Sequence, residues 1–273
     1  VYKRQSLPGM IRCGLIALCL SALLVAAGEE AMPCAVSSDT KLPFFGDLHI
    51  HTRYSFDSYL SNQRNDPDGA YEYAKGQVIT LPDAYGDQTL SAQIDRPIDF
   101  AAVTDHGQFL GEVALCDSDW TEPGWWAPVC IMSRTQNLWV QLYAASLWTV
   151  SGGMEGEAPE RGLVCSLGDC EAKALSTWDD IQAAAERHYD RSEDCSFTTF
   201  VGYEYTQGQE MANLHRNVIF KGEQVTRLPI SVFETDSSVP ELWRQLRYQC
   251  LEADGDCDVM AIPHNPNLGG GLM

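Results

Sequence analysis

Short apolar runs alternate with longer segments of mixed polarity along most of the chain. Residues 177–190 ("TWDDIQAAAERHYD") predict a helix with Thr177 as its N-cap, and residues 133–148 and 240–253 also show helical periodicity. Strands separated by helix-length segments indicate an α/β protein with parallel strands. The apolar runs that predict these strands cover Phe44–Ile50, Ile98–Thr104, Thr198–Tyr205, Asn217–Phe220 and Val259–Pro263.

The N-terminal part of the chain has the layout of an export signal, with Met10 as the expected natural start. A single arginine precedes an apolar run over residues 15–27, and small residues follow before Glu29. The run is short for a membrane-spanning helix and fits a signal peptide better. We therefore expect a signal region over residues 1–28, a linker over 29–43 and a periplasmic or secreted protein. A buried N-terminal helix and a retained anchor are the alternatives.

Residues 44–273 are expected to form one domain. The stretch around 116–170 is rich in Gly, Pro and Trp, which indicates an elaborated insertion. The sequence stops at "PHNPNLGGGLM", just after the last predicted strand, and a domain rarely ends there. We expect a fragment with further strands missing at the C-terminal side.

The cysteine count agrees with export. Of ten cysteines, Cys13 and Cys19 lie in the signal region. An even number remains, which favours disulfides in an exported chain. A thiolate zinc site is the alternative, but the sequence has no C-x-x-C pair. The first expectation is that sequence neighbours pair: Cys116 with Cys130, Cys165 with Cys170 and Cys250 with Cys257, while Cys34 and Cys195 stay unassigned.

Composition excludes some classes of partner. The chain has 273 residues, 45% hydrophobic and 21% charged, which is enough for one large core. Its formal net charge of −20 would repel nucleic acid and anionic membranes. An anionic substrate remains possible if a local source of positive charge exists, and metal ions would supply one.

Histidines mark the expected site of chemistry. His49 and His51 occupy positions i and i+2 of a predicted strand, so their side chains project to the same side and can reach one ion. An H-x-H pair also occurs by chance, but three more histidines lie at predicted strand edges or ends: His106, His215 and His264. With Glu204 near another strand end, this set predicts a metal centre of the zinc, manganese or iron type. His188 lies in a predicted helix and is left out.

The ordered motifs "GDLHIHT", "AVTDHG", "GYEY", "HRNVIF" and "IPHNPN" resemble those of the PHP (polymerase and histidinol phosphatase) superfamily. The closest likeness is to an exported branch catalogued as a domain of unknown function, and it covers the chain from about Phe44. The resemblance implies a distorted (β/α)7 TIM-like barrel, here incomplete at its C-terminus, with two or three divalent metals. It also implies hydrolysis of phosphate or phosphonate esters.

The resemblance also implies a role for each ligand. His49 and His51 would hold a first metal, and Glu204 would bridge it to a second metal held by His215 and His264. His106 and Asp57 would hold a third, although several relatives have histidine where Asp57 stands. The late Asp-x-His motif of PHP domains is missing, which agrees with the expected truncation and puts the activity of the fragment in doubt.

Further residues are assigned supporting roles. Glu204, His106 and Asp105 are the expected catalytic residues, with Asp105 orienting a neighbouring imidazole. Asp47 is expected on the same strand face as His49, as a second supporting carboxylate. The substrate would be a small anionic ester. Three cations are candidates to bind it, with plain surface charges as the alternative interpretation: Arg53, Arg216 and Lys75.

Two other classes of protein fit parts of the pattern. An amidohydrolase also begins with H-x-H, but such sites often use a carboxylated lysine where this chain has Glu204. A metal-binding barrel that has lost catalysis is the second rival. The substrate, the metal, the number of ions and the oligomeric state are left open by the sequence.

Overall fold

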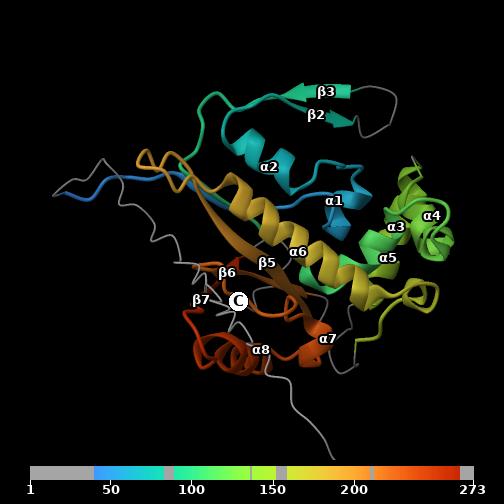
Figure 1. Ribbon diagram of the computed structural model, residues 1–273. Coiled ribbons are helices and arrows are strands. Elements are labelled where there is room, and N and C mark those ends of the chain that lie inside the picture. Colours follow the sequence, from blue (N-terminus) through green and yellow to red (C-terminus); the bar gives the residue numbers. More distant parts are fainter. Residues whose placement is uncertain (1–39, 83–88, 136, 152–158, 210–211, 265–273) are drawn as a thin grey trace, which may run out of the picture.

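The computed structural model describes residues 40–82, 89–135, 137–151, 159–209 and 212–264 (Figure 1). The strands are β1 (Gly46–Ile50), β2 (Ile79–Pro82), β3 (Thr89–Ala92), β4 (Phe100–Val103), β5 (Thr198–Gln209), β6 (Ala212–Phe220) and β7 (Val259–His264). The helices are α1 (Phe56–Leu60), α2 (Pro67–Ala74), α3 (Leu110–Cys116), α4 (Pro128–Ser133), α5 (Leu138–Ser151), α6 (Cys170–His188), α7 (Val232–Thr235) and α8 (Val239–Leu246). Short 3₁₀ turns cover Gly107–Phe109, Pro123–Trp126 and Leu163–Ser166, and one π-helical turn covers Arg247–Leu251.

Five strands form one curled sheet, a half-barrel, in the order β1-β4-β5-β6-β7. All five predicted strands are present. β5 and β6 are longer than predicted, and β2 and β3 form a separate antiparallel hairpin that the sequence analysis did not predict. The curl brings the ends of strands that are far apart in the sequence to one edge.

The expected (β/α)7 barrel is wrong, and so is the expectation of parallel strands throughout. β1, β4 and β5 are parallel, but β6 pairs antiparallel with β5, and β7 pairs antiparallel with β6. The reason is local: β5 ends at Gln209 and β6 begins at Ala212, and so short a connection can only reverse the chain into a hairpin. The prediction placed a helix-length segment there because it began the next strand at Asn217.

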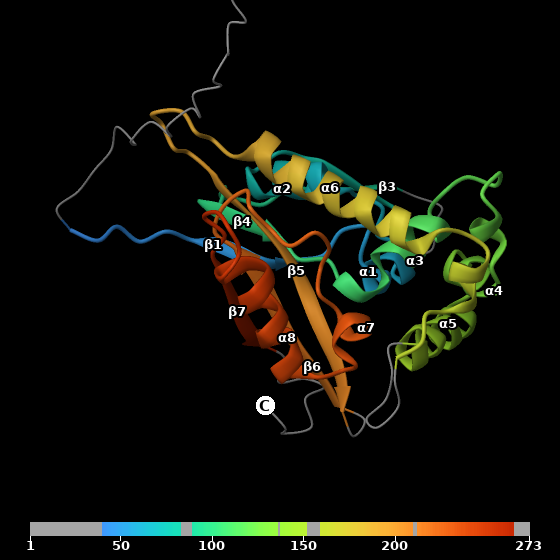
Figure 2. The ribbon, with the colours of Figure 1, turned by 60° about the horizontal axis from the view of Figure 1, so that its bottom comes forward.

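Helices α2, α6 and α8 cover the outer face of the sheet (Figure 2). Val103, Val201 and Val218 point outward from three strands and pack with Trp178 of α6 and Leu242 of α8. Each of these side chains is at most 3% exposed, and burying one aliphatic side chain stabilises the fold by about 1.5–3 kcal/mol. With the outer face packed in this way, the inner face is available for polar chemistry.

Helix α6 begins earlier than predicted. Its N-cap is Asp169, whose side chain accepts a hydrogen bond from the Ala172 backbone N–H at 3.0 Å, and it runs from Cys170 to His188. The predicted cap, Thr177, is 5% exposed and faces the core from the middle of the helix. The prediction was wrong because two aspartates following Thr177 also fit a first turn.

A second, smaller core lies where the segment 116–170 meets the main domain. Phe109 and Leu115 pack with Ala144 and Trp148 of α5, beside Tyr59 of α1. The expected disulfides are confirmed in three pairs, Cys116–Cys130, Cys165–Cys170 and Cys250–Cys257. The first two crosslink this region. The six cysteines of the three disulfides are therefore not thiolate zinc ligands.

The predicted signal region, most of the predicted linker, and Cys34 lie outside the described residues. Within the described part of the chain, none of the helices combines the length and the apolar character needed to cross a bilayer.

Candidate metal centre

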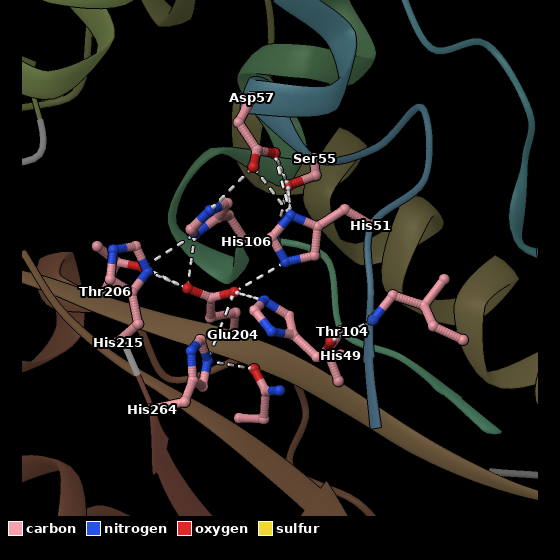
Figure 3. A network of polar contacts seen from close by, with 12 residues as sticks. His49, His51, Ser55, Asp57, Thr104, His106, Glu204, Thr206, His215 and His264 are labelled. Carbon is pink, nitrogen blue, oxygen red and sulfur yellow. Dashed lines mark hydrogen bonds and ion pairs between the residues drawn. The ribbon is translucent and has the colours of Figure 1, made fainter. Parts of the chain in front are cut away.

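Seven predicted ligand side chains meet on the inner face of the sheet (Figure 3). His188, which was left out, lies apart on α6 with its Nε2 atom 2.9 Å from Asp68. The seven are His49 in β1, His51 just after it, Asp57 in α1, His106 just after β4, Glu204 in β5, His215 in β6 and His264 at the end of β7.

Strand register explains the convergence. β1, β4 and β5 are parallel, so their carboxyl-terminal ends lie at one edge. His215 pairs with Thr206 of β5 on one side and with His264 of β7 on the other, which places the three in one row. His106 forms a bridge with Glu204 where β4 leaves the sheet.

Glu204 lies at the centre of the cluster and is 1% exposed. The Nε2 atoms of His49 and His51 lie 3.0 and 2.8 Å from its Oε2. Its Oε1 contacts Nδ1 of His215 and lies 3.7 Å from Nδ1 of His106. Burial by itself would raise the pKa of Glu204, but the surrounding imidazoles hold the pKa well below its usual range.

His51 lies between the two carboxylates. Its Nδ1 is 2.9 Å from Asp57 Oδ2, and its Nε2 faces Glu204. Burial lowers the pKa of His51, but hydrogen bonds to Asp57 and Glu204 outweigh it and raise the pKa to about 10. A neutral imidazole binds a metal through one nitrogen and donates a hydrogen bond from the other. His51 fits both roles, because its Nε2 lies in the ligand group with Glu204 and its Nδ1 faces Asp57.

His264 is at the side of the cluster nearest His49. The two ring centroids are 4.1 Å apart, against 5.8 Å between His264 and His215. Its Nε2 lies 3.1 Å from Asn217 Oδ1 and 3.9 Å from Glu204 Oε2, and burial lowers its pKa to about 4. The structure therefore places His264 beside His49, whereas the PHP resemblance assigns it to the same ion as His215.

The side chains form three overlapping groups that could hold a metal ion. In each group the ligand atoms lie within 4.8 Å of one another. Imidazole nitrogens and carboxylate oxygens suit zinc, manganese or iron, and a buried carboxylate surrounded by imidazoles fits this donor set. A fourth group of Glu112, Cys165 and Cys170 does not fit, because its two sulfurs form a disulfide. The three fitting groups are His49–His51–Glu204, His51–Asp57–His106 and His106–Glu204–His215.

The two supporting aspartates lie where the sequence analysis did not expect them. Asp105 is fully buried and accepts hydrogen bonds from the Thr52 backbone N–H at 2.5 Å and from the Thr52 hydroxyl at 2.6 Å. It therefore fixes the loop that carries His51, and its described contacts include no imidazole. Burial raises the pKa of Asp105 to about 6, against the effect of the Thr52 hydrogen bonds.

Asp47 and His49 do not share a strand face. Asp47 pairs with Ala101, but Ile50 pairs with Val103, so β1 has one residue more than β4 over this stretch. Such a β-bulge shifts the alternation of side chains. Asp47 is exposed and accepts a hydrogen bond from the His49 backbone N–H at 2.9 Å.

The three cations that were candidates for substrate binding make no contact with the cluster in the described part of the chain. Arg53 is paired with Asp117, and Lys75 lies at the end of α2 with its ammonium 5.9 Å from the centre of the Phe197 ring. Arg216 follows His215 in β6 and therefore points to the opposite, outer face, where its guanidinium lies near Trp243. A role for these cations at the cluster is not supported.

Three hydroxyl and amide side chains of the cluster escaped the sequence analysis. The Thr206 hydroxyl lies 2.9 Å from His106 Nδ1 and 3.0 Å from His215 Nδ1. Ser55 donates to Asp57 at 2.6 Å, and Asn217 holds His264. Strand alternation could have predicted Thr206 and Asn217, because each stands two positions after a predicted ligand and therefore shares its strand face.

The fold and the cluster define an α/β half-barrel with a histidine–carboxylate site of metal-binding type. The family model described as "Protein of unknown function (DUF3604)" matches residues 38–273, and the chain belongs to this family. Neither a comparison with curated proteins nor one with solved structures found a match.

Proposed function

We propose that the protein is an exported, metal-dependent hydrolase of small anionic esters, with phosphate and phosphonate esters as the first substrate class. The observation that carries the proposal is the position of Glu204. Its two carboxylate oxygens each face a different pair of imidazoles: His49 and His51 at Oε2, and His106 and His215 at Oε1.

This arrangement supports two ions that share Glu204. One set of donors is His49, His51 and one oxygen of Glu204, and the other is His106, His215 and the second oxygen. Asp57 then accepts the N–H of His51, which fixes the ring and raises its basicity as a ligand. A third ion at Asp57 would take the second ring nitrogen of His51 and of His106, whose other nitrogens face Glu204. Each ring would then have to bind two ions at once and lose its N–H proton, so we propose two ions.

Divalent ions, when bound, supply positive charge to an anionic ester and lower the pKa of a water molecule. The residues of the chain would hold the ions and orient the rings that bind them. The Thr206 hydroxyl lies beside the Nδ1 atoms of His106 and His215 that would hold the second ion, and Asn217 fixes the ring of His264. The side chains of His49 and Asp57 are 46% and 44% exposed, so this is the side from which a substrate reaches the cluster.

The positions of the arginines agree with a role for metal ions as the source of positive charge. Arg53 is neutralised by Asp117, and Arg216 faces the other side of the sheet. An anionic ester at the cluster would therefore obtain its counter-charge from metal ions. The likeness of the motifs to PHP proteins favours phosphorus esters, and three disulfides favour an oxidising, exported setting.

The test uses the full chain, stripped of metal and then loaded with Zn²⁺, Mn²⁺ or Fe²⁺. Phosphomonoesters, phosphodiesters and phosphonate esters are offered beside carboxyl esters and amides. We expect turnover of a phosphorus ester that requires metal and is lost in Glu204→Gln. The matched control is Glu241→Gln, a partly exposed position on α8 outside the cluster that should keep full activity.

The rival classes are separate outcomes of the same test. Turnover of amides or carboxyl esters alone would assign the protein to amidohydrolase-type chemistry. A protein that binds two ions but cleaves no ester would be a catalytically inactive metal-binding protein. Either result would overturn the proposal.

A further inference from the structure

A cavity of about 600 Å³ opens directly beside the metal-binding cluster. His49 and His51 are among the residues that line it. Other residues of β1, the segment from Thr52 to Asn65, helix α2, the β2–β3 hairpin and the segment that follows the hairpin contribute the rest. This hairpin cavity is lined on its apolar side by Ala70, Tyr73, Ile79, Leu81, Ala92 and Ile94.

The hairpin has two different faces. Ile79 and Leu81 line the cavity, and Ala92, which pairs with Ile79, lies on the same side. Thr80 and Ser91 pair with each other on the other face and are exposed. Alternation of this kind normally places the apolar face of a hairpin on a packed core.

Here the apolar face of the hairpin covers the cavity instead. Ile79, Leu81 and Ala92 belong to neither of the two core clusters, although Ile98 and Ala70 touch the larger one. The side chains around an open cavity lack partner atoms, so an apolar ligand that fills the cavity would gain contacts that the free protein does not make. The volume falls within the usual range of small-molecule sites, about 300–1,000 Å³.

The charge of the lining restricts what the cavity can hold. Among the described residues that line it, Asp47 is the one carboxylate, and none is Lys or Arg. A second phosphate or another anionic group would meet no counter-charge there and would be repelled by Asp47. The lining therefore fits an uncharged, largely apolar group.

We infer that the hairpin cavity binds the uncharged apolar part of the substrate while the anionic ester group lies at the histidine cluster. This inference rests on the proposed function and names its substrate class: monoesters of hydrophobic alcohols rather than nucleotides or sugar phosphates. In the hydrolysis, the oxygen of water bonds to phosphorus and the bond to the ester oxygen breaks. The alcohol leaves with one proton from water, and inorganic phosphate is the second product.

The test compares 3-phenylpropyl phosphate with propyl phosphate, whose leaving alcohols have similar acidity. Burial of the phenyl ring should raise kcat/KM about tenfold or more for the larger ester on the metal-loaded full chain. In Ala92→Trp the new side chain fills the cavity, and the preference should disappear. Ser91→Trp places the same side chain on the exposed face of the same strand and should keep the preference.

A second measurement does not depend on catalysis. Ligand-observed NMR of the metal-free protein with 3-phenylpropanol, a neutral alcohol, should show binding to the wild type and to Ser91→Trp but not to Ala92→Trp. Equal kcat/KM for the two esters in the wild type, together with no binding of the alcohol, would overturn the cavity assignment and leave the proposed function intact. Selective binding of the alcohol without hydrolysis of either ester would sink the proposed function and retain the apolar site.

Discussion

Replacement of Glu204 by Gln tests the arrangement of the metal centre most directly. The change keeps the size of the side chain but removes its negative charge. Two of the three ligand groups contain Glu204, and the third consists of His51, Asp57 and His106. We therefore expect the wild type to bind two ions per chain and Glu204→Gln to bind at most one.

The expected effect on stability can be worked from this count. An ion at a free concentration of 100 times its Kd stabilises the folded state by about 2.7 kcal/mol per site, which corresponds to a rise in Tm of about 5–10 °C for a chain of this size. The wild type should show this shift for two sites, and Glu204→Gln for at most one. Metal analysis by mass spectrometry after dialysis, with melting curves at rising metal concentration, measures both quantities.

Asp57→Asn is the matched control, because it leaves both groups that contain Glu204. Loss of the hydrogen bond to His51 should weaken metal binding about 10–100-fold without changing the number of ions. Two tightly bound ions and a full metal-induced Tm shift in Glu204→Gln would refute the shared-carboxylate arrangement. Loss of one whole ion in Asp57→Asn would instead make Asp57 a direct ligand.

Three further predictions concern residues outside the cluster. Arg216→Met should raise the free energy of unfolding by about 1 kcal/mol and leave metal content unchanged. Among the described residues the buried Nη1 of Arg216 has no hydrogen-bond partner, and the guanidinium makes cation–π contacts with Tyr205 and Trp243. Lower stability in urea denaturation would contradict this. Burial raises the pKa of Glu112 above its ordinary value of 4.5 despite its ion pair with Arg161. The protonated side chain therefore favours the folded state, and this stabilisation is complete below pH 4.5 and is lost as pH rises through the raised pKa. Urea denaturation between pH 4 and 8 should therefore show the wild type losing stability relative to Glu112→Gln as pH rises, and a constant difference would refute it. Replacing Cys116 and Cys130 by alanine opens a crosslink with a sequence separation of 14 and should cost about 3 kcal/mol without loss of metal; metal loss from a protein with an intact circular dichroism spectrum would contradict it.

Local chemistry was sufficient to predict the strands and most of the site. Each predicted strand is an apolar, β-rich run, and buried strands need such runs wherever they lie in the fold. His49 and His51 were expected together because side chains alternate along a strand. The structure brings both to Glu204. The three disulfides between near neighbours in the sequence were also predicted correctly.

Strand direction and side-chain orientation were predicted less well. The two-residue gap between Gln209 and Ala212 makes β5 and β6 antiparallel, where a helix-length segment between parallel strands was expected. The bulge in β1 moved Asp47 away from the face of His49. Arg216 lies on the outer face because its neighbour His215 points inward, an alternation that the sequence analysis did not apply to it.

The amino-acid sequence by itself determined which side chains can take part in metal chemistry and which segments are strands, because these depend on residue type and on periodicity over a few positions. Only the tertiary structure decided how the ligands are grouped, that Glu204 lies between two pairs of imidazoles, that Asp105 holds Thr52, and that an apolar cavity opens beside His49 and His51. The physical reason is that these relations arise between segments up to about two hundred residues apart, and sheet curl, strand pairing and helix packing set their distances.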